Sequence, residues 1–257
     1  MAIQLLISDL DGTLLGPDSV ITPGTAQALA RARQAGLRLL VTTGRAWGTA
    51  APLLQQAGVS CDFVLLNGAE YRTAQGELVR AVPLQPATAR HAVAVLRRYD
   101  LGFEINTDAG DFTTDTELCP TAQPLPRRAA FWAGQPQVRK IFAFSRNPDA
   151  LARAKQMLQS LPDATVTASA DWNLEVTARD AQKGTMARWV TQRSGIAPDQ
   201  ALVFGDGCND LSLFRAFVHT RAMGNAATPL QALAEQVIEP NTEDGVAREI
   251  ERLLMKQ

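Results

Sequence analysis

Two aspartates separated by a single residue follow the first apolar segment of the chain. Residues 3–8 form that segment, Asp9 comes directly after it, and Asp11 precedes Gly12. Side chains alternate along an extended chain, so the two carboxylates begin on the same side. Carboxylates held this close repel each other and lose hydration, and a cation between them removes that cost. The residues alone also leave open an ordinary polar turn after a strand.

Two further segments carry groups that suit an anion. Thr43 and Gly44 follow the apolar residues 37–42. They offer a hydroxyl group and a backbone N–H near the start of a helix, where phosphate commonly binds. Lys183 stands at the start of another expected helix, which is unfavourable because that end already carries partial positive charge. Lys183 therefore predicts an anionic partner. The alternatives are an ordinary helix cap and a solvated surface lysine.

A second group of acids follows the apolar residues 201–204. Asp206, Asn209 and Asp210 lie in a glycine-containing turn. A calcium-binding loop is the plain alternative, but the remaining ligand positions of such a loop are missing. Together with the earlier groups, the chain offers four carboxylates, a lysine, a hydroxyl group and several amides. This set could hold a magnesium ion, a phosphate and a nucleophilic aspartate at the same time.

The elements that must position these groups alternate between strand and helix. Apolar runs and helix boundaries repeat through residues 1–82 and resume over 180–257. This pattern predicts an α/β fold with a Rossmann-like parallel sheet covered on both faces. In such a sheet, ligands bind beyond the carboxyl ends of the strands. Residues 83–179 instead show short adjacent strands with few helices. We expect them to form an inserted α+β domain, an antiparallel sheet backed by two helices.

Composition excludes several classes of function. Hydrophobic residues make up 46% of the 257 residues and charged residues 20%, which supports packed cores and argues against disorder. The formal net charge is -1 with scattered basic residues, so neither a nucleic-acid nor a membrane surface is indicated. Three cysteines without Cys-x-x-Cys spacing predict free thiols in a cytoplasmic protein, and two histidines argue against a His-rich zinc site. P-loop, dinucleotide and signal-peptide patterns are missing from the sequence, as is a bilayer-spanning run.

Four short motifs, in order along the chain, resemble those of the haloacid dehalogenase-like hydrolase superfamily. They are Asp9-Leu10-Asp11-Gly12-Thr13, Thr43-Gly44, Lys183-Gly184 and Gly205-Asp206-x-x-Asn209-Asp210. The segment inserted between the second and third motifs resembles the α/β cap of the Cof-like subfamily, also called IIB. Three further segments match this subfamily as well: Asn67-Gly68-Ala69, Ala222–Ala226 and Glu243–Val246.

This resemblance implies a Mg²⁺-dependent phosphatase that hydrolyses small phosphate monoesters, such as sugar phosphates, through an aspartyl-phosphate on Asp9. Asp11 would protonate the leaving alcohol and then deprotonate the attacking water. Mg²⁺ would be bound by Asp9, the backbone carbonyl of Asp11 and Asp206, and Asp210 would orient metal-bound water or Lys183. The phosphate oxygens would be held by the amide of Leu10 and by Thr43, Gly44, Lys183 and Asn209.

The inserted domain, by the same resemblance, would close over the site, exclude water and recognise the rest of the substrate. The residues weighed for such contacts are polar or aromatic, and for each a surface or packing role is the commoner one: Arg45, Glu104, Asp108, Asp111, Asp115, Trp132 and Trp172. His219 falls in an expected core strand and is interpreted as structural.

Three other activities stay open at this point. A phosphomutase or sugar-phosphate phosphotransferase would form the same aspartyl-phosphate but pass the group to a sugar hydroxyl. A signalling receiver also gathers acids, a hydroxyl and a lysine around a phosphorylated aspartate, but receivers are much shorter and have no inserted domain. A haloacid dehalogenase is disfavoured because Asp11 and the metal site at Asp206 serve phosphate chemistry. The sequence specifies neither the individual substrate nor the choice between monomer and homodimer.

Overall fold

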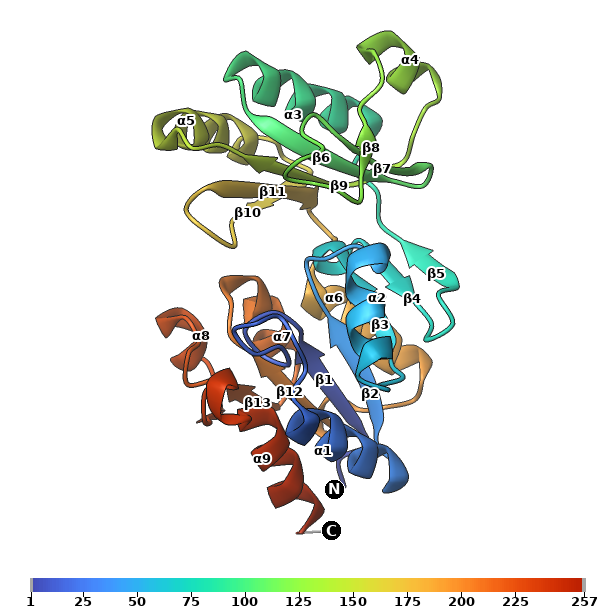
Figure 1. Ribbon diagram of the computed structural model, residues 1–257, viewed down its shortest axis with the longest axis vertical. Helices are drawn as coiled ribbons and strands as arrows, with labels where there is room; N and C mark the ends of the chain where they lie inside the picture. The colour runs from blue at the N-terminus through green and yellow to red at the C-terminus, as the bar shows by residue number, and fades with distance from the viewer. Residues whose placement is uncertain (1, 256–257) are drawn as a thin grey trace. The chain divides into compact units, whose positions relative to one another are not determined.

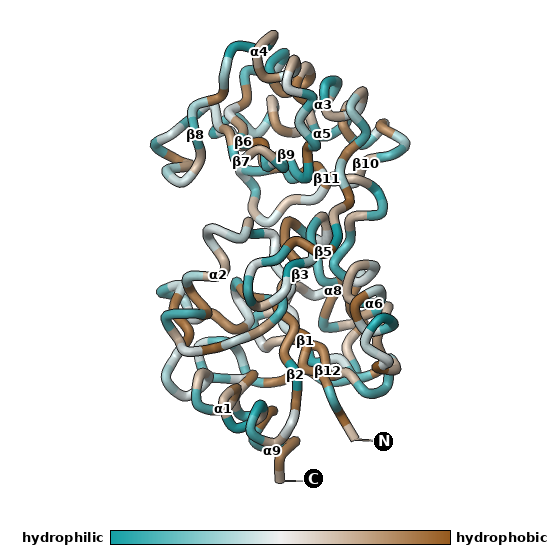
Figure 2. The backbone as a smooth tube through the Cα atoms, turned by 90° about the vertical axis from the view of Figure 1, so that its right-hand side faces the viewer, coloured by the Kyte–Doolittle hydropathy of each residue, from teal (hydrophilic) through white to brown (hydrophobic). Residues whose placement is uncertain are grey.

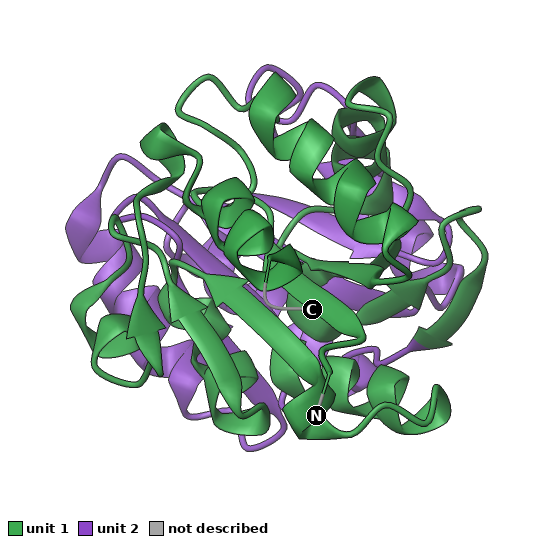
Figure 3. Ribbon diagram, turned by 90° about the horizontal axis from the view of Figure 1, so that it is seen from below, with its two compact units in different colours: residues 1–80, 182–257 green, residues 81–181 purple. Residues whose placement is uncertain are grey.

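Two compact units make up the fold. The computed structural model describes residues 2–255. Its first unit comprises residues 1–80 and 182–257, and its second comprises residues 81–181 (Figure 3). The second unit is therefore an insertion in the sequence of the first. The boundaries lie within two residues of those expected from the sequence, 82/83 and 179/180.

The first unit is built on an 8-stranded sheet with the order β14-β13-β12-β1-β2-β3-β4-β5. From β14 to β3 each strand runs parallel to its neighbour, and β4 pairs antiparallel with β3. The predicted α/β class with a Rossmann-like parallel sheet is confirmed. Figure 1 labels the elements of this unit except β14. They are β1 (Leu5–Asp9), α1 (Pro23–Gln34), β2 (Arg38–Thr42), α2 (Trp47–Gln56), β3 (Asp62–Leu65), β4 (Glu70–Arg72), β5 (Leu78–Ala81), α6 (Lys183–Arg193), β12 (Ala201–Gly205), α7 (Leu211–Ala216), β13 (His219–Ala222), α8 (Thr228–Gln231), β14 (Gln236–Val237) and α9 (Gly245–Leu254).

Hydrophobic strands form the core of this unit. β1 and β12 are buried along their whole length, and Figure 2 shows hydrophobic residues concentrated along the strands at the middle of the sheet. Helices pack around the sheet in pairs, α1 beside α9 and α6 beside α7 (Figure 1). Because apolar side chains occupy both faces of the central strands, polar groups that serve chemistry are left to the strand ends.

The second unit holds a 6-stranded sheet with the order β10-β11-β9-β6-β7-β8. Its pairs are antiparallel except for β7 with β8, and α3 and α5 pack on it. The short helix α4 and strand β8 are not predicted, because elements this short between prolines are too brief to show a periodic pattern. The elements are α3 (Pro86–Arg98), β6 (Gly102–Thr107), β7 (Gly110–Thr113), β8 (Gln123–Pro124), α4 (Arg128–Ala133), β9 (Val138–Phe144), α5 (Pro148–Gln159), β10 (Ala164–Thr167) and β11 (Asn173–Ala178).

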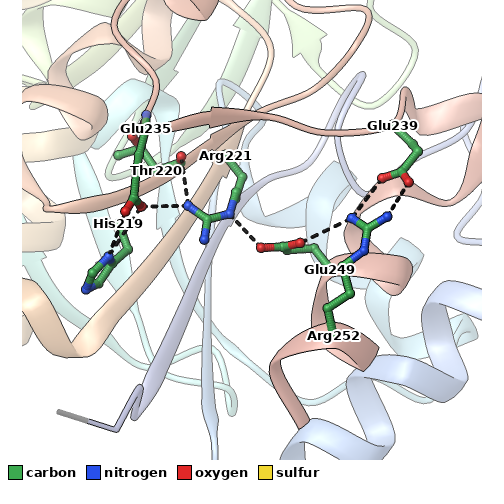
Figure 4. Close-up of polar contacts among 7 residues, drawn as sticks. All are labelled: His219, Thr220, Arg221, Glu235, Glu239, Glu249 and Arg252. Atoms are coloured by element: carbon green, nitrogen blue, oxygen red, sulfur yellow. Dashed lines mark hydrogen bonds and ion pairs between the residues drawn. The ribbon is translucent and has the colours of Figure 1, made fainter. Parts of the chain in front are cut away.

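A chain of ion pairs joins the outer strands of the first unit to α9 (Figure 4). Arg221, on β13, donates to Glu235 and to Glu249, each at 2.6 Å. Arg252 continues the chain from Glu249 at 3.3 Å. The ring of His219 lies 3.3 Å from Glu235. β14 has only two residues, and these side-chain contacts link the segment before it to β13 and α9.

Two expectations from composition can be compared with the fold. Cys61, Cys119 and Cys208 are free thiols. Within residues 2–255, no helix combines the length and the apolar composition needed to span a bilayer.

Candidate active site

Three carboxylates converge at the carboxyl ends of two neighbouring strands. Asp9 is the last residue of β1, and Asp206 and Asp210 follow β12, which pairs with β1. One oxygen from each carboxylate lies within 4.8 Å of the other two. Asp9 and Asp210 are buried, and Asp206 is partly buried. The parallel sheet thus brings together acids from opposite ends of the sequence.

One buried ammonium group lies among these acids. Lys183 is the first residue of α6, and its side chain is fully buried. Its Nζ donates to Asp9 at 2.6 Å and to Asp210 at 2.7 Å. These carboxylates are the anionic partners that a lysine at the amino end of a helix requires. Gly184 allows the close packing of this helix, because a Cβ there would lie 2.1 Å from the backbone oxygen of Ser212 on α7.

Glycines allow the acidic loops to approach each other. Gly12 has a φ of +78°, and a Cβ there would lie 2.3 Å from Oδ2 of Asp206. A Cβ at Gly205 would lie 2.8 Å from Oδ2 of Asp210. The hydroxyl of Thr13 donates to Asp206 at 2.8 Å, and Asp210 accepts two backbone N–H groups of its own turn, at 3.1 and 3.2 Å. The two loops therefore hold their carboxylates in fixed directions.

The acid cluster carries more negative than positive charge. Burial raises the pKa of Asp9 well above its ordinary value, the charge of Lys183 opposes this, and Asp210 and Asp206 add to it. Burial and the charge of Asp210 also raise the pKa of Asp206. Burial would lower the pKa of Lys183, but the charges of Asp210 and Asp9 outweigh it and raise that pKa. Three carboxylates around one ammonium group fit a divalent cation, and Mg²⁺ prefers such oxygen ligands.

Asp11 lies outside the group of three carboxylates. Its carboxylate forms a two-point ion pair with Arg45, in which Nε donates to Oδ2 at 2.8 Å and Nη2 donates to Oδ1 at 2.5 Å. The side chain of Asp11 is 49% exposed. The sequence suggests Arg45 as a substrate contact, whereas the structure places its guanidinium on Asp11. Strand alternation cannot reveal this pair, because it forms between two loops that only the sheet brings together.

The residues expected to hold phosphate lie after strands of the same sheet. They follow β1, β2 and β12 and are Leu10, Thr43, Gly44 and Asn209. Thr43 is buried, and its hydroxyl accepts the backbone N–H of Arg45 at 3.1 Å. Asn209 donates from Nδ2 to Oδ1 of Asn67 at 3.3 Å. Asn67 belongs to a motif noted in the sequence, but sequence reasoning gives it no role.

Most candidates for substrate contact in the second unit take part in local structure. Asp108 accepts the backbone N–H of Gln137, just before β9, and Asp115 accepts two backbone N–H groups of its own turn. Trp132 is buried on α4, and Glu104 accepts a hydrogen bond at 2.7 Å from the asparagine two residues later. Trp172 is 48% exposed. Of these five side chains, Asp108 and Trp172 belong to exposed residues.

Comparisons with known families, proteins and solved structures agree with one another. Residues 6–250 match the family described as haloacid dehalogenase-like hydrolase. The chain is 25% identical to phosphatase YwpJ of Bacillus subtilis (strain 168), over 98% of this chain and 100% of that protein. It is 26% identical to pyridoxal phosphate phosphatase YbhA of Escherichia coli (strain K12), over 96% and 97%. Among solved structures it resembles the subclass IIB sugar phosphatase BT4131, with a TM-score of 0.85, 22% identity, and coverage of 97% of this chain and 98% of that one.

Proposed function

The chain belongs to the haloacid dehalogenase-like hydrolase family, and we propose that it is a Mg²⁺-dependent phosphatase of small phosphate monoesters. The observation that carries the proposal is the buried cluster in which Lys183 bridges Asp9 and Asp210 beside Asp206. Phosphatases are among its relatives, and a subclass IIB sugar phosphatase is among its structural neighbours. The match to a family of hydrolases favours an enzyme over the signalling receiver.

The proposed reaction has two steps on one carboxylate. In the first, an oxygen of Asp9 bonds to phosphorus, the bond from phosphorus to the ester oxygen breaks, and Asp11 gives its proton to the leaving alcohol. In the second, Asp11 takes a proton from a water whose oxygen attacks the same phosphorus. The bond from phosphorus to Asp9 then breaks and inorganic phosphate leaves. In each step, Asp11 must give up one of its two hydrogen bonds with Arg45 so that it can contact the reacting oxygen.

The surrounding residues stabilise negative charge and orient the reacting groups during these two steps. Asp9, Asp206 and the backbone carbonyl of Asp11 would hold Mg²⁺, which, when bound, offsets the repulsion between a carboxylate and a phosphate dianion. Lys183 stabilises negative charge on the phosphoryl oxygens, and Asp210 orients Lys183. The amide of Leu10, with Thr43, Gly44 and Asn209, completes the set of phosphate-binding groups.

The two units take different parts in this proposal. The first unit is the catalytic core, and the second is a cap that contacts the part of the substrate beyond the phosphate. Relatives named for pyridoxal phosphate and sugar phosphates suggest a metabolite of that size. A cytoplasmic location, and a monomer or a homodimer, remain predictions from the sequence.

The test is phosphate release over a panel of phosphorylated metabolites, with Mg²⁺ and with EDTA. Asp9→Asn should abolish turnover while the melting temperature and circular dichroism stay those of a folded protein. Asp18→Asn, the same change at an exposed position, should leave turnover unchanged. Wild-type turnover in Asp9→Asn, or in EDTA, would refute the proposal. Transfer of phosphate to an added sugar phosphate, in place of release, would reassign the chain as a phosphotransferase.

A further inference from the structure

The turn after β3 has an unusual backbone. Leu66, Asn67 and Gly68 have successive positive φ angles of 53°, 58° and 104°. This left-handed region is costly for a leucine, because its Cβ approaches the following carbonyl oxygen. All three residues are buried. A strained, buried turn persists only where its surroundings hold it, and such turns concentrate at functional sites.

The turn is held by two loops that carry site residues. The N–H of Leu66 donates to the carbonyl oxygen of Arg45 at 3.1 Å, and the N–H of Asn67 donates to that of Thr43 at 3.0 Å. On the other side, a Cβ at Gly68 would lie 2.4 Å from the backbone carbonyl of Gln182, the residue before Lys183. The turn therefore fits between the loop after β2 and the start of α6.

The side chain of Asn67 reaches a third loop. It is 6% exposed, and its Oδ1 accepts the hydrogen bond from Nδ2 of Asn209 at 3.3 Å. A primary amide has two N–H groups that lie in one plane. When one of them is fixed on Asn67, the direction of the other is fixed as well. The second N–H of Asn209 is thereby oriented before any ligand arrives.

We propose that Asn67 is a positioning residue of the phosphate site, which acts by orienting the amide of Asn209. This inference rests on the proposed function, since it takes Asn209 to be a phosphate ligand. Asparagine suits this position for two reasons, because it tolerates the left-handed backbone better than most residues and carries an acceptor. The strained turn places that acceptor against Asn209.

Asn67→Gly separates these two properties. Glycine adopts the left-handed backbone freely, so the turn is kept while the acceptor is lost. The loss of one oriented hydrogen bond should raise KM and the inhibition constant of inorganic phosphate by about three- to tenfold each. Equilibrium binding of inorganic phosphate, measured by calorimetry with Mg²⁺ present, should weaken by the same factor. Asp100→Gly makes the same backbone change at an exposed position with φ of 53° in the second unit, and should leave all three constants unchanged.

A double-mutant cycle distinguishes positioning from a general structural role. In the background of Asn209→Ala, Asn67→Gly should change phosphate affinity by less than about twofold, because the amide that it orients is gone. Unchanged phosphate affinity in Asn67→Gly alone, or the full loss persisting in the Asn209→Ala background, would overturn the inference. Failure of the proposed function is a different result, in which Asp9→Asn retains turnover.

Discussion

Replacing Lys183 with methionine removes the positive charge from the acid cluster and tests its electrostatics. The side chain is fully buried and lies 2.6 and 2.7 Å from two carboxylates. At an effective dielectric constant of about 20, each attraction is about 6 kcal/mol before desolvation is subtracted. Desolvation of the three charged groups offsets most of this. Removing one partner of a buried ion pair costs about 3–5 kcal/mol, and we expect that loss in Lys183→Met at pH 8.

The stability lost in Lys183→Met should depend on pH, in a direction that follows from the pKa of Asp9. Burial, together with the charges of Asp210 and Asp206, raises the pKa of Asp9 even with Lys183 present, and removing the ammonium group raises it further. The folded variant then keeps a proton that the unfolded chain releases. Its stability is therefore greatest at low pH and falls as pH rises from the ordinary carboxylate value of 3.8 towards the raised one. A single proton changes stability by at most about 1.4 kcal/mol per pH unit, and the wild type shares this dependence up to its own, less raised pKa. The stability lost in Lys183→Met should therefore be smaller at pH 5.5 than at pH 8.

The assay is urea unfolding of the wild type and the variant at pH 5.5 and pH 8, with EDTA and with Mg²⁺. Mg²⁺ should stabilise the variant more than the wild type, because it replaces the missing positive charge. Lys155→Met, on α5 in the second unit, controls for the loss of a lysine outside the cluster. The reasoning is wrong if Lys183→Met loses the same stability at both pH values and gains no more from Mg²⁺ than the wild type.

Two further predictions concern the acid–base residue and the edge of the sheet. Asp11→Asn should slow hydrolysis of alkyl phosphates by about 100-fold or more. It should affect p-nitrophenyl phosphate much less, because p-nitrophenolate leaves without a proton. Equal losses in kcat on both substrates would contradict the acid role of Asp11. Partial burial favours a higher pKa for Glu235, but the hydrogen bonds and charges of Arg221 and His219 outweigh it and lower that pKa below its ordinary 4.5. Glu235→Gln should therefore destabilise the protein at pH 7, by less than about 1 kcal/mol because the pair is partly exposed. The difference should shrink as pH falls below 4.5 and vanish once pH is below the lowered pKa. A difference in urea unfolding that is as large at pH 3 as at pH 7 would contradict this account.

The order of elements could be derived from local patterns. The alternation of apolar runs with capped helices predicts the parallel sheet, because a strand buried on both faces must be apolar throughout, as β1 is. Lys183 could be singled out because its position conflicts with the helix dipole, and the structure supplies carboxylates at that point. A helix as short as α4 contains too few residues for hydrophobic periodicity to be detected in the sequence.

The sequence by itself determined the residue types of the site and the strand ends at which they stand. The tertiary structure decided which of them touch. Asp11 pairs with Arg45 and not with its neighbour Asp9, and Asn209 bonds to Asn67 from a different loop. The physical reason is that local propensity acts over a few residues, whereas these contacts depend on the order of strands in the sheet and on how closely glycines let the loops approach.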